Sequence, residues 1–178
     1  MPLFLTGEKQ VGKSTALRRA LTASGLRFGG VMTRFDARHG LRALYLLPYS
    51  AEGELPEGAA LPEGAALPES AVCARMGGAG KQVFPQVFDE RGAALLREAE
   101  DAEVIVIDEL GYLESEAAGF REAVLRVLRG PKPVVGVVRQ GLGAWADAPL
   151  GTVIEVTAAN REEVPALVRK WLREQTGK

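Results

Sequence analysis

The sequence predicts an α/β fold, in which a mostly parallel sheet carries helices on both faces and an antiparallel hairpin. Near the start, a short apolar strand over residues 2–5 leads through a glycine-containing loop into a helix over residues 13–24. Later, residues 104–107 are four consecutive β-branched residues, which is typical of a buried strand in a parallel sheet. Open sheets of this class place their ligand sites at the carboxyl ends of the strands.

The composition predicts an ordinary globular protein. The length of 178 residues suits one domain spanning 1–178, and the formal net charge of −1 favours neither a nucleic-acid nor a membrane partner. The single cysteine, Cys73, excludes an internal disulfide and is expected in the core of a protein from a reducing compartment. The first strand leaves no room for a signal peptide, and no apolar run approaches membrane-spanning length. We therefore expect a cytoplasmic monomer.

The strongest motif is the loop after the first strand, Gly7-Glu8-Lys9-Gln10-Val11-Gly12-Lys13-Ser14, followed by Thr15. Its glycines allow a tight turn whose N–H groups face a phosphate, and the helix N-terminus behind it adds partial positive charge. Lys13 is placed to reach the β- and γ-phosphates, and the Ser14 hydroxyl is placed to bind Mg²⁺. This Walker A spacing predicts that residues 7–15 bind a nucleoside triphosphate.

A second motif ends the buried strand, where Asp108 and Glu109 follow the apolar run. This is the Walker B arrangement. We expect Asp108 to hold Mg²⁺ through one of its waters, and Glu109 to orient or deprotonate an attacking water. Glu109 and Lys13 are therefore the predicted catalytic residues, and Ser14 and Asp108 the predicted metal-binding residues.

Residues 31–35 and 41–49 predict two strands of an antiparallel hairpin, with a polar turn between them. His39, the only histidine, lies in that turn and is expected to be solvated. Thr33 is a secondary site candidate, because a strand that leaves the first helix can pass close to the phosphates. An exposed strand position is the alternative for Thr33.

The middle of the chain contains a short repeat, Leu-Pro-Glu-Gly-Ala-Ala, within residues 51–72. Its prolines and glycines interrupt helices and strands, so we expect a low-complexity insertion loop there. The glycine-rich stretch 77–81 lacks a second Gly-Lys-Ser/Thr element and predicts a mobile loop. A helix is expected over residues 89–102.

The last third predicts a helix over 116–129, strands over 133–138 and 151–156, and a final helix. Leu167, Trp171 and Leu172 are expected to dock that helix on the sheet. Arg139 is a secondary site candidate, and Trp145, in the irregular stretch that follows, is a further one. Asn160 has a structural alternative, as the N-cap of the final helix in a capping box with Glu163.

Nearly end to end, the chain resembles the small nucleoside-triphosphatases first characterised as thermostable enzymes, the family that includes cancer-related nucleoside triphosphatase. The resemblance implies a P-loop NTPase with a RecA-like sheet, in which strand 134–138 lies between the loop strand and the Walker B strand. It also implies Mg²⁺-dependent hydrolysis of several nucleoside triphosphates, with Asn160 and Arg161 beside the base or ribose. The matching pieces are Thr6-Gly7-Glu8, Val11 to Thr15, Gly30 to Thr33, Gly40 to Arg42, Val106 to Gly111, Val156-Thr157 and Asn160-Arg161.

The chain departs from this family at Lys9-Gln10, where Pro-Gly is usual, in the repeat, and over residues 139–149. Two other function classes stay open. A nucleotide or small-molecule kinase would need an acceptor pocket and arginine clamps, for which Arg139 is the one candidate. A nucleotide-dependent switch or accessory protein would find its best support in the acidic repeat; a guanine-specific switch is disfavoured because no Asn-Lys-x-Asp element is present.

Overall fold

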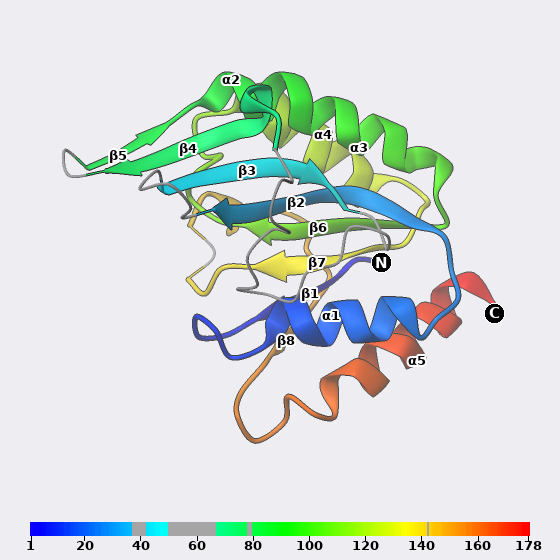
Figure 1. The fold of residues 1–178 in the computed structure, drawn as a ribbon. Helices are drawn as coiled ribbons and strands as arrows, with labels where there is room; N and C mark the ends of the chain where they lie inside the picture. Colours follow the sequence, from blue (N-terminus) through cyan, green and yellow to red (C-terminus); the bar gives the residue numbers. More distant parts are fainter. Residues whose placement is uncertain (37–41, 50–66, 78–79, 142) are drawn as a thin grey trace.

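A computed structural model describes residues 1–36, 42–49, 67–77, 80–141 and 143–178, and it has the predicted α/β fold (Figure 1). The described residues form one eight-stranded sheet of order β5-β4-β3-β2-β6-β7-β1-β8. Its strands are β1 (Leu3–Thr6), β2 (Phe28–Asp36), β3 (Arg42–Pro48), β4 (Val72–Gly77), β5 (Gly80–Val83), β6 (Val104–Leu110), β7 (Val134–Val138) and β8 (Thr152–Glu155).

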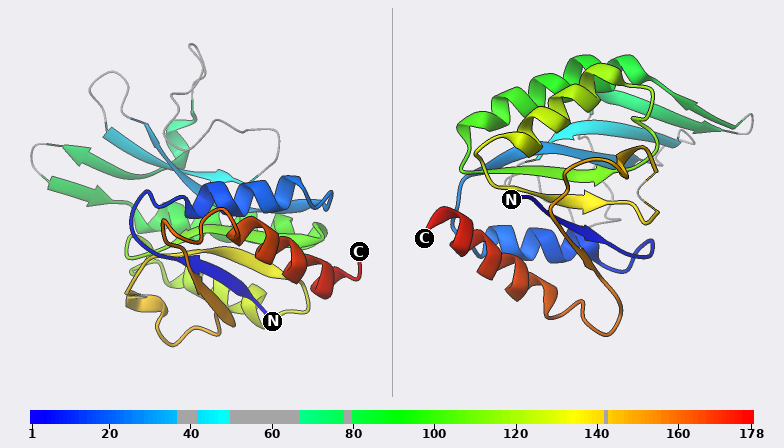
Figure 2. Two further views of the ribbon diagram at one scale, coloured as in Figure 1. Left: turned by 90° about the horizontal axis from the view of Figure 1, so that it is seen from below. Right: turned by 180° about the vertical axis from the view of Figure 1, so that it is seen from behind.

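The described chain has five α-helical segments: α1 (Lys13–Thr22), α2 (Pro85–Val87), α3 (Ala93–Glu98), α4 (Ala118–Arg129) and α5 (Val164–Thr176). A π-helical turn, Phe88–Gly92, joins α2 to α3, and 3₁₀ turns cover Glu69–Ala71, Ala99–Asp101 and Gly143–Trp145. The helices α1 and α5 lie side by side on one face of the sheet, while α3 and α4 cover the other (Figures 1 and 2).

The sheet has a parallel and an antiparallel part. Strands β2, β6, β7, β1 and β8 pair in parallel, so their carboxyl ends meet at one edge. The prediction that β7 lies between β1 and β6 is confirmed. The predicted hairpin is also confirmed, because β2 pairs antiparallel with β3; its turn, with His39, lies outside the described residues.

Burial on both faces explains the apolar run of β6. Because side chains alternate along a strand, Ile105 and Ile107 pack in the core beneath α3 and α4, while Val104 and Val106 pack in the core with α1 and α5. The same alternation divides β1, whose Phe4 joins the first core and whose Leu5 joins the second. Cys73 is fully buried as expected, and burial raises its pKa to about 12.

The prediction of a loop over 77–81 is wrong at the residues of this stretch that the structure describes, 77 and 80–81. Gly77 ends β4 and Gly80 begins β5, and these two residues pair across an antiparallel ladder. The predicted insertion also ends earlier than residue 72, because Ala71 and Val72 are buried. Residues 50–66, which hold most of the repeat, lie outside the described chain.

Helix boundaries and one docking residue also differ from prediction. The helical segment expected over 89–102 begins at Pro85, which is favoured in a first turn, and α4 begins at Ala118 rather than at 116. Leu167 is 48% exposed, whereas Val164, Val168, Trp171 and Leu172 form the buried face of α5. None of the described helices combines the length and apolarity that crossing a membrane requires.

Leu172→Ala should lower the free energy of unfolding by about 2–5 kcal/mol, because it leaves a cavity where a fully buried side chain packs. Leu167→Ala is the matched control on the same helix and should change it by less than about 0.5 kcal/mol. Urea denaturation measures both. Equal destabilisation by the two variants would contradict the observed face of α5.

Candidate active site

The loop between β1 and α1 depends on its glycines. Gly7 and Gly12 have φ angles of 136° and 105°, a region that side chains rarely occupy. A Cβ on Gly7 would also lie 2.3 Å from the carbonyl oxygen of Val156. Gln10, with φ 63°, is the one non-glycine residue in the described chain with a positive φ. Such a left-handed turn forms the concave, N–H-lined backbone that binds anions.

Lys13 is the first residue of α1 and folds back over this loop. Its ammonium donates to the carbonyl oxygens of Gly7, at 3.0 Å, and Glu8, at 2.8 Å. The side chain is only 7% exposed, so the charge is held within the turn. An ammonium has three N–H donors, and these two carbonyls engage two of them.

Ser14 joins the loop to the end of β6. Its Oγ donates to Asp108 Oδ1 at 3.0 Å, and Asp108 is 8% exposed. The hydroxyl and the carboxylate are hard oxygen donors of the kind that Mg²⁺ prefers. Within the described residues, no group of three or more His, Cys, Asp and Glu could enclose a metal. The pair therefore suits Mg²⁺, which usually takes one or two protein ligands and completes its shell with waters and phosphates.

Glu109 follows Asp108 and is half-buried. Its Oε1 lies 3.9 Å from the position that a Cβ on Gly111 would take. Gly111 is in turn bonded to a buried carboxyl, because its N–H donates to Glu114. Burial raises the pKa of Glu114, although hydrogen bonds from Gly111 and Trp145 oppose that rise.

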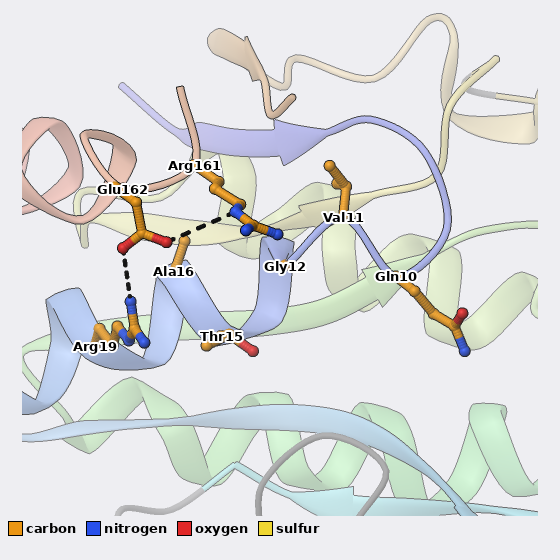
Figure 3. Close-up of a pocket in the computed structure, with 8 residues that line it drawn as sticks. All are labelled: Gln10, Val11, Gly12, Thr15, Ala16, Arg19, Arg161 and Glu162. Atoms are coloured by element: carbon orange, nitrogen blue, oxygen red, sulfur yellow. Dashed lines mark hydrogen bonds and ion pairs between the residues drawn. The ribbon is translucent and has the colours of Figure 1, made fainter. Parts of the chain in front are cut away.

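A pocket of about 310 Å³ opens beside the phosphate loop (Figure 3). Glu162 bridges two arginines at its rim, with 3.2 Å to Arg19 and 3.6 Å to Arg161. All three side chains are more than half exposed, so these ion pairs are weak and can rearrange. The pocket is lined by Gln10, Val11, Gly12, Thr15, Ala16, Arg19, Arg161 and Glu162.

Asn160 organises the segment that carries Arg161. Its Oδ1 accepts from the Thr157 N–H at 2.8 Å, and its Nδ2 donates to the Glu155 carbonyl at 2.8 Å. The predicted capping box with Glu163 is wrong, because Glu163 itself is the N-cap residue of α5. Thr157 and Asn160 instead bond each other reciprocally at the exit from β8, since the Asn160 N–H reaches Thr157 Oγ1 at 3.4 Å.

A family model described as NTPase matches residues 2–168 of this chain. The chain belongs to this NTPase family. Its relatives include the nucleoside-triphosphatase THEP1 of Thermococcus kodakarensis, 32% identical over 182 residues, which cover 98% of this chain and 96% of the relative. The THEP1 of Pyrococcus abyssi is 28% identical over 191 residues, covering 100% and 96%. Both relatives are named as nucleoside-triphosphatases, which are hydrolases.

A solved structure has the same fold. The crystal structure of THEP1 from Aquifex aeolicus superimposes with a TM-score of 0.69, covering 97% of this chain and 99% of that one, at 22% identity. The likeness supports the P-loop NTPase fold that the sequence predicts.

Most of the predicted site residues lie at one edge of the sheet, but several of them do not line the pocket. Glu8 and Lys9 are exposed and do not line the pocket. Arg139 lies with its guanidinium 4.6 Å from the centre of the Tyr112 ring, outside the pocket lining. Thr33 follows Met32, which pairs with Asp108 across the β2–β6 ladder, so it lies at the same edge without lining the pocket.

Sequence reasoning missed four residues of this region: Arg19, Glu162, Glu114 and Trp145 as a buried hydrogen-bond donor. For Arg19 a signal existed, because helical spacing places it on the same face of α1 as Thr15. No local motif marks Glu162 or Glu114, since each has one partner far away in the chain, Arg19 and Trp145 respectively.

Asn160→Ala should lower the free energy of unfolding by about 1–2 kcal/mol, because backbone groups of Thr157 and Glu155 lose their side-chain partner. Urea denaturation measures this, and amide hydrogen exchange should show faster opening at Thr157. Arg161→Ala, which breaks an exposed ion pair, should change the stability by less than about 0.5 kcal/mol. An Asn160→Ala protein of unchanged stability that loses nucleotide affinity would indicate direct contact instead.

Proposed function

We propose that the protein is a Mg²⁺-dependent nucleoside-triphosphatase, which hydrolyses ATP, GTP and other nucleoside triphosphates to the diphosphate and phosphate. The observation that carries the proposal is the meeting of Lys13, Ser14 and Asp108 at one edge of the sheet, with Glu109 next in the chain. The names of the relatives support the same reaction class.

The phosphate loop binds the triphosphate in this proposal. Backbone N–H groups of residues 7–12 surround the phosphates, and the N-terminus of α1 adds its partial positive charge. Lys13 is held in the turn by two carbonyl oxygens and presents its remaining N–H donor to the β- and γ-phosphates. The charge on the phosphates is thus balanced before reaction, which is the main requirement of phosphoryl transfer.

Ser14 and Asp108 would hold Mg²⁺, and the bound ion would neutralise the charge that develops on the phosphate oxygens. Glu109 lies one residue beyond Asp108 and is the candidate to orient a water and accept its proton. Hydrolysis requires this water to be positioned in line with the leaving oxygen. Thr33, at the same edge, remains a candidate to contact the phosphate region.

The base is recognised loosely in this proposal. The pocket beside the loop offers two arginines bridged by one exposed carboxylate, and mobile surface groups of this kind adapt to different hydrogen-bonding edges. Arg161 also offers a planar guanidinium that can stack on any base or bond a ribose hydroxyl. Asn160 holds the segment that carries Arg161 in place, because its side chain bonds the Thr157 N–H and the Glu155 carbonyl oxygen.

We further propose a cytoplasmic monomer without nucleic-acid or membrane partners. The formal net charge of −1 and the single buried cysteine are consistent with this setting.

A panel of nucleoside triphosphates with Mg²⁺ tests the function. Phosphate release is expected from each, with similar KM values for purine and pyrimidine substrates and no increase when nucleosides or nucleoside monophosphates are added as acceptors. Lys13→Ala should abolish binding or turnover and keep the native circular dichroism spectrum, because the side chain supports the ligand site. Undiminished hydrolysis by a folded Lys13→Ala protein would contradict the phosphate-loop assignment, and phosphate transfer to an acceptor would indicate a kinase.

Glu109→Gln should retain affinity for the Mg-nucleotide but lose turnover by roughly two to four orders of magnitude, the range of a lost general base. Asp108→Asn should instead raise the Mg²⁺ concentration needed for half-maximal rate, because a carboxylate beside Ser14 is replaced by a neutral amide. Rate measurements over a Mg²⁺ titration separate the two. Identical binding and rate profiles for both variants would show that the division of roles is wrong.

A further inference from the structure

Glu114 is an acid buried close to the reaction centre, and the proposed mechanism does not use it. It lies in the turn between β6 and α4 and is only 4% exposed. The turn is ordered by its own backbone, because the Glu114 carbonyl accepts from the Ala117 N–H at 3.0 Å and the Tyr112 carbonyl accepts from Ser115. The Glu114 carboxyl therefore belongs to a short turn with its own hydrogen bonds, and this turn begins at Gly111, two residues after Glu109.

Trp145 brings a second loop to the same carboxyl. It belongs to the segment after β7 and is fully buried in the core beneath α3 and α4. Its Nε1–H lies 3.0 Å from Glu114 Oε1 and 3.1 Å from the Gly111 carbonyl oxygen, so it donates to both. The indole ring is also 5.2 Å from the guanidinium of Arg121, on α4.

Gly111 is consequently bonded at both of its backbone groups. Its N–H donates to Glu114 and its carbonyl accepts from Trp145. A Cβ on Gly111 would lie 3.9 Å from Glu109 Oε1 and 3.7 Å from Cδ of Arg139, so both side chains are close to this residue. The peptide that these bonds hold therefore lies near the Glu109 carboxylate.

We propose that Glu114 is a positioning residue: by accepting hydrogen bonds from Gly111 and Trp145, it fixes the peptide beside Glu109 and so sets the direction in which that carboxylate faces the attacking water. The inference rests on the proposed function of Glu109. A small displacement of a group that must be aligned in the transition state lowers the rate of reaction. A buried residue that holds such a group in place, as Glu114 would hold the peptide beside Glu109, therefore affects the rate.

A buried acid at this place has an electrostatic cost as well as a hydrogen-bonding role. Burial of a carboxyl is unfavourable unless its oxygens are bonded, and Glu109 adds a second negative charge nearby. The charge of Glu109, on β6, raises the pKa of the Glu114 carboxyl, and Arg121, on α4, lies over the indole that donates to this carboxyl. An apolar side chain of similar volume would fill the space without this cost but would leave the Gly111 N–H without its acceptor.

The experiment compares Glu114→Leu with Glu114→Gln, using MgATP as the probe. Glu114→Leu keeps the volume and removes the acceptor, so kcat should fall roughly 10²-fold while the dissociation constant for MgATP stays within about twofold of the wild type. Glu114→Gln keeps an acceptor oxygen for both N–H groups and should retain kcat within roughly threefold. This rescue distinguishes positioning by hydrogen bonds from a direct role of the charge.

Trp145→Phe provides a second variant, which keeps the Glu114 carboxyl and removes the N–H donor. It should lower kcat in the same way, and adding Glu114→Leu to it should cause little further loss, because both act through one network. Trp171→Phe is the matched control: Trp171 packs in the other core, with α1 and α5, and its loss should leave kcat unchanged. In the Trp171→Phe background, the fluorescence of Trp145 reports directly whether Glu114→Leu changes its surroundings.

Wild-type kcat in folded Glu114→Leu or Trp145→Phe would overturn the proposal, as would an equal loss of kcat in Glu114→Gln and Glu114→Leu. If Glu114→Leu does not fold, Trp145→Phe and Glu114→Gln carry the same test. Failure of the proposed function has a different signature, because then the wild-type protein releases no phosphate or Glu109→Gln hydrolyses normally.

Discussion

The hydrogen bond between Ser14 and Asp108 connects the loop after β1 to the end of β6, across the intervening strand β7. Neighbouring strands are separated by about 4.8 Å, so the phosphate loop and Asp108 approach each other from strands roughly 10 Å apart. Parallel pairing places both at one edge, and Gly136 of β7 keeps the strands between them close. A Cβ there would lie 2.7 Å from the Phe4 ring and 2.3 Å from the Ile107 carbonyl oxygen. The geometry of the site therefore depends on the absence of a side chain at Gly136.

Local patterns were sufficient to predict the centre of the fold and much of the site. The glycine spacing of the loop, the β-branched run of β6 and the two acids after it each carry their information within a few residues. The loop pattern is visible in the sequence because Gly7 and Gly12 have left-handed φ angles, which favour glycine at these two positions. Strand order, by contrast, was inferred from the family resemblance and not from the residues themselves.

Features that depend on distant partners could not be predicted in this way. Glu114 is buried and accepts a hydrogen bond from Trp145, and the two are 31 positions apart. Glu162 and Arg19 are 143 positions apart. The strands β4 and β5 were missed because glycines at 77–80 suggest a loop, whereas pairing with β3 draws the first of them into the sheet. Leu167 was misplaced because an apolar residue near the buried face of a helix need not belong to it.

The two strands at the ends of the sheet, β5 and β8, are both short. Edge strands expose unpaired N–H and C=O groups to which another chain can add, and proteins limit that risk by keeping such strands short and polar. Here β5 and β8 contain four residues each, and β5 carries Lys81 and Gln82. A neighbouring chain that approached either edge would gain few hydrogen bonds and, at β5, would have to remove water from a charged side chain. Short edge strands thereby make the sheet poorly suited to extend from molecule to molecule.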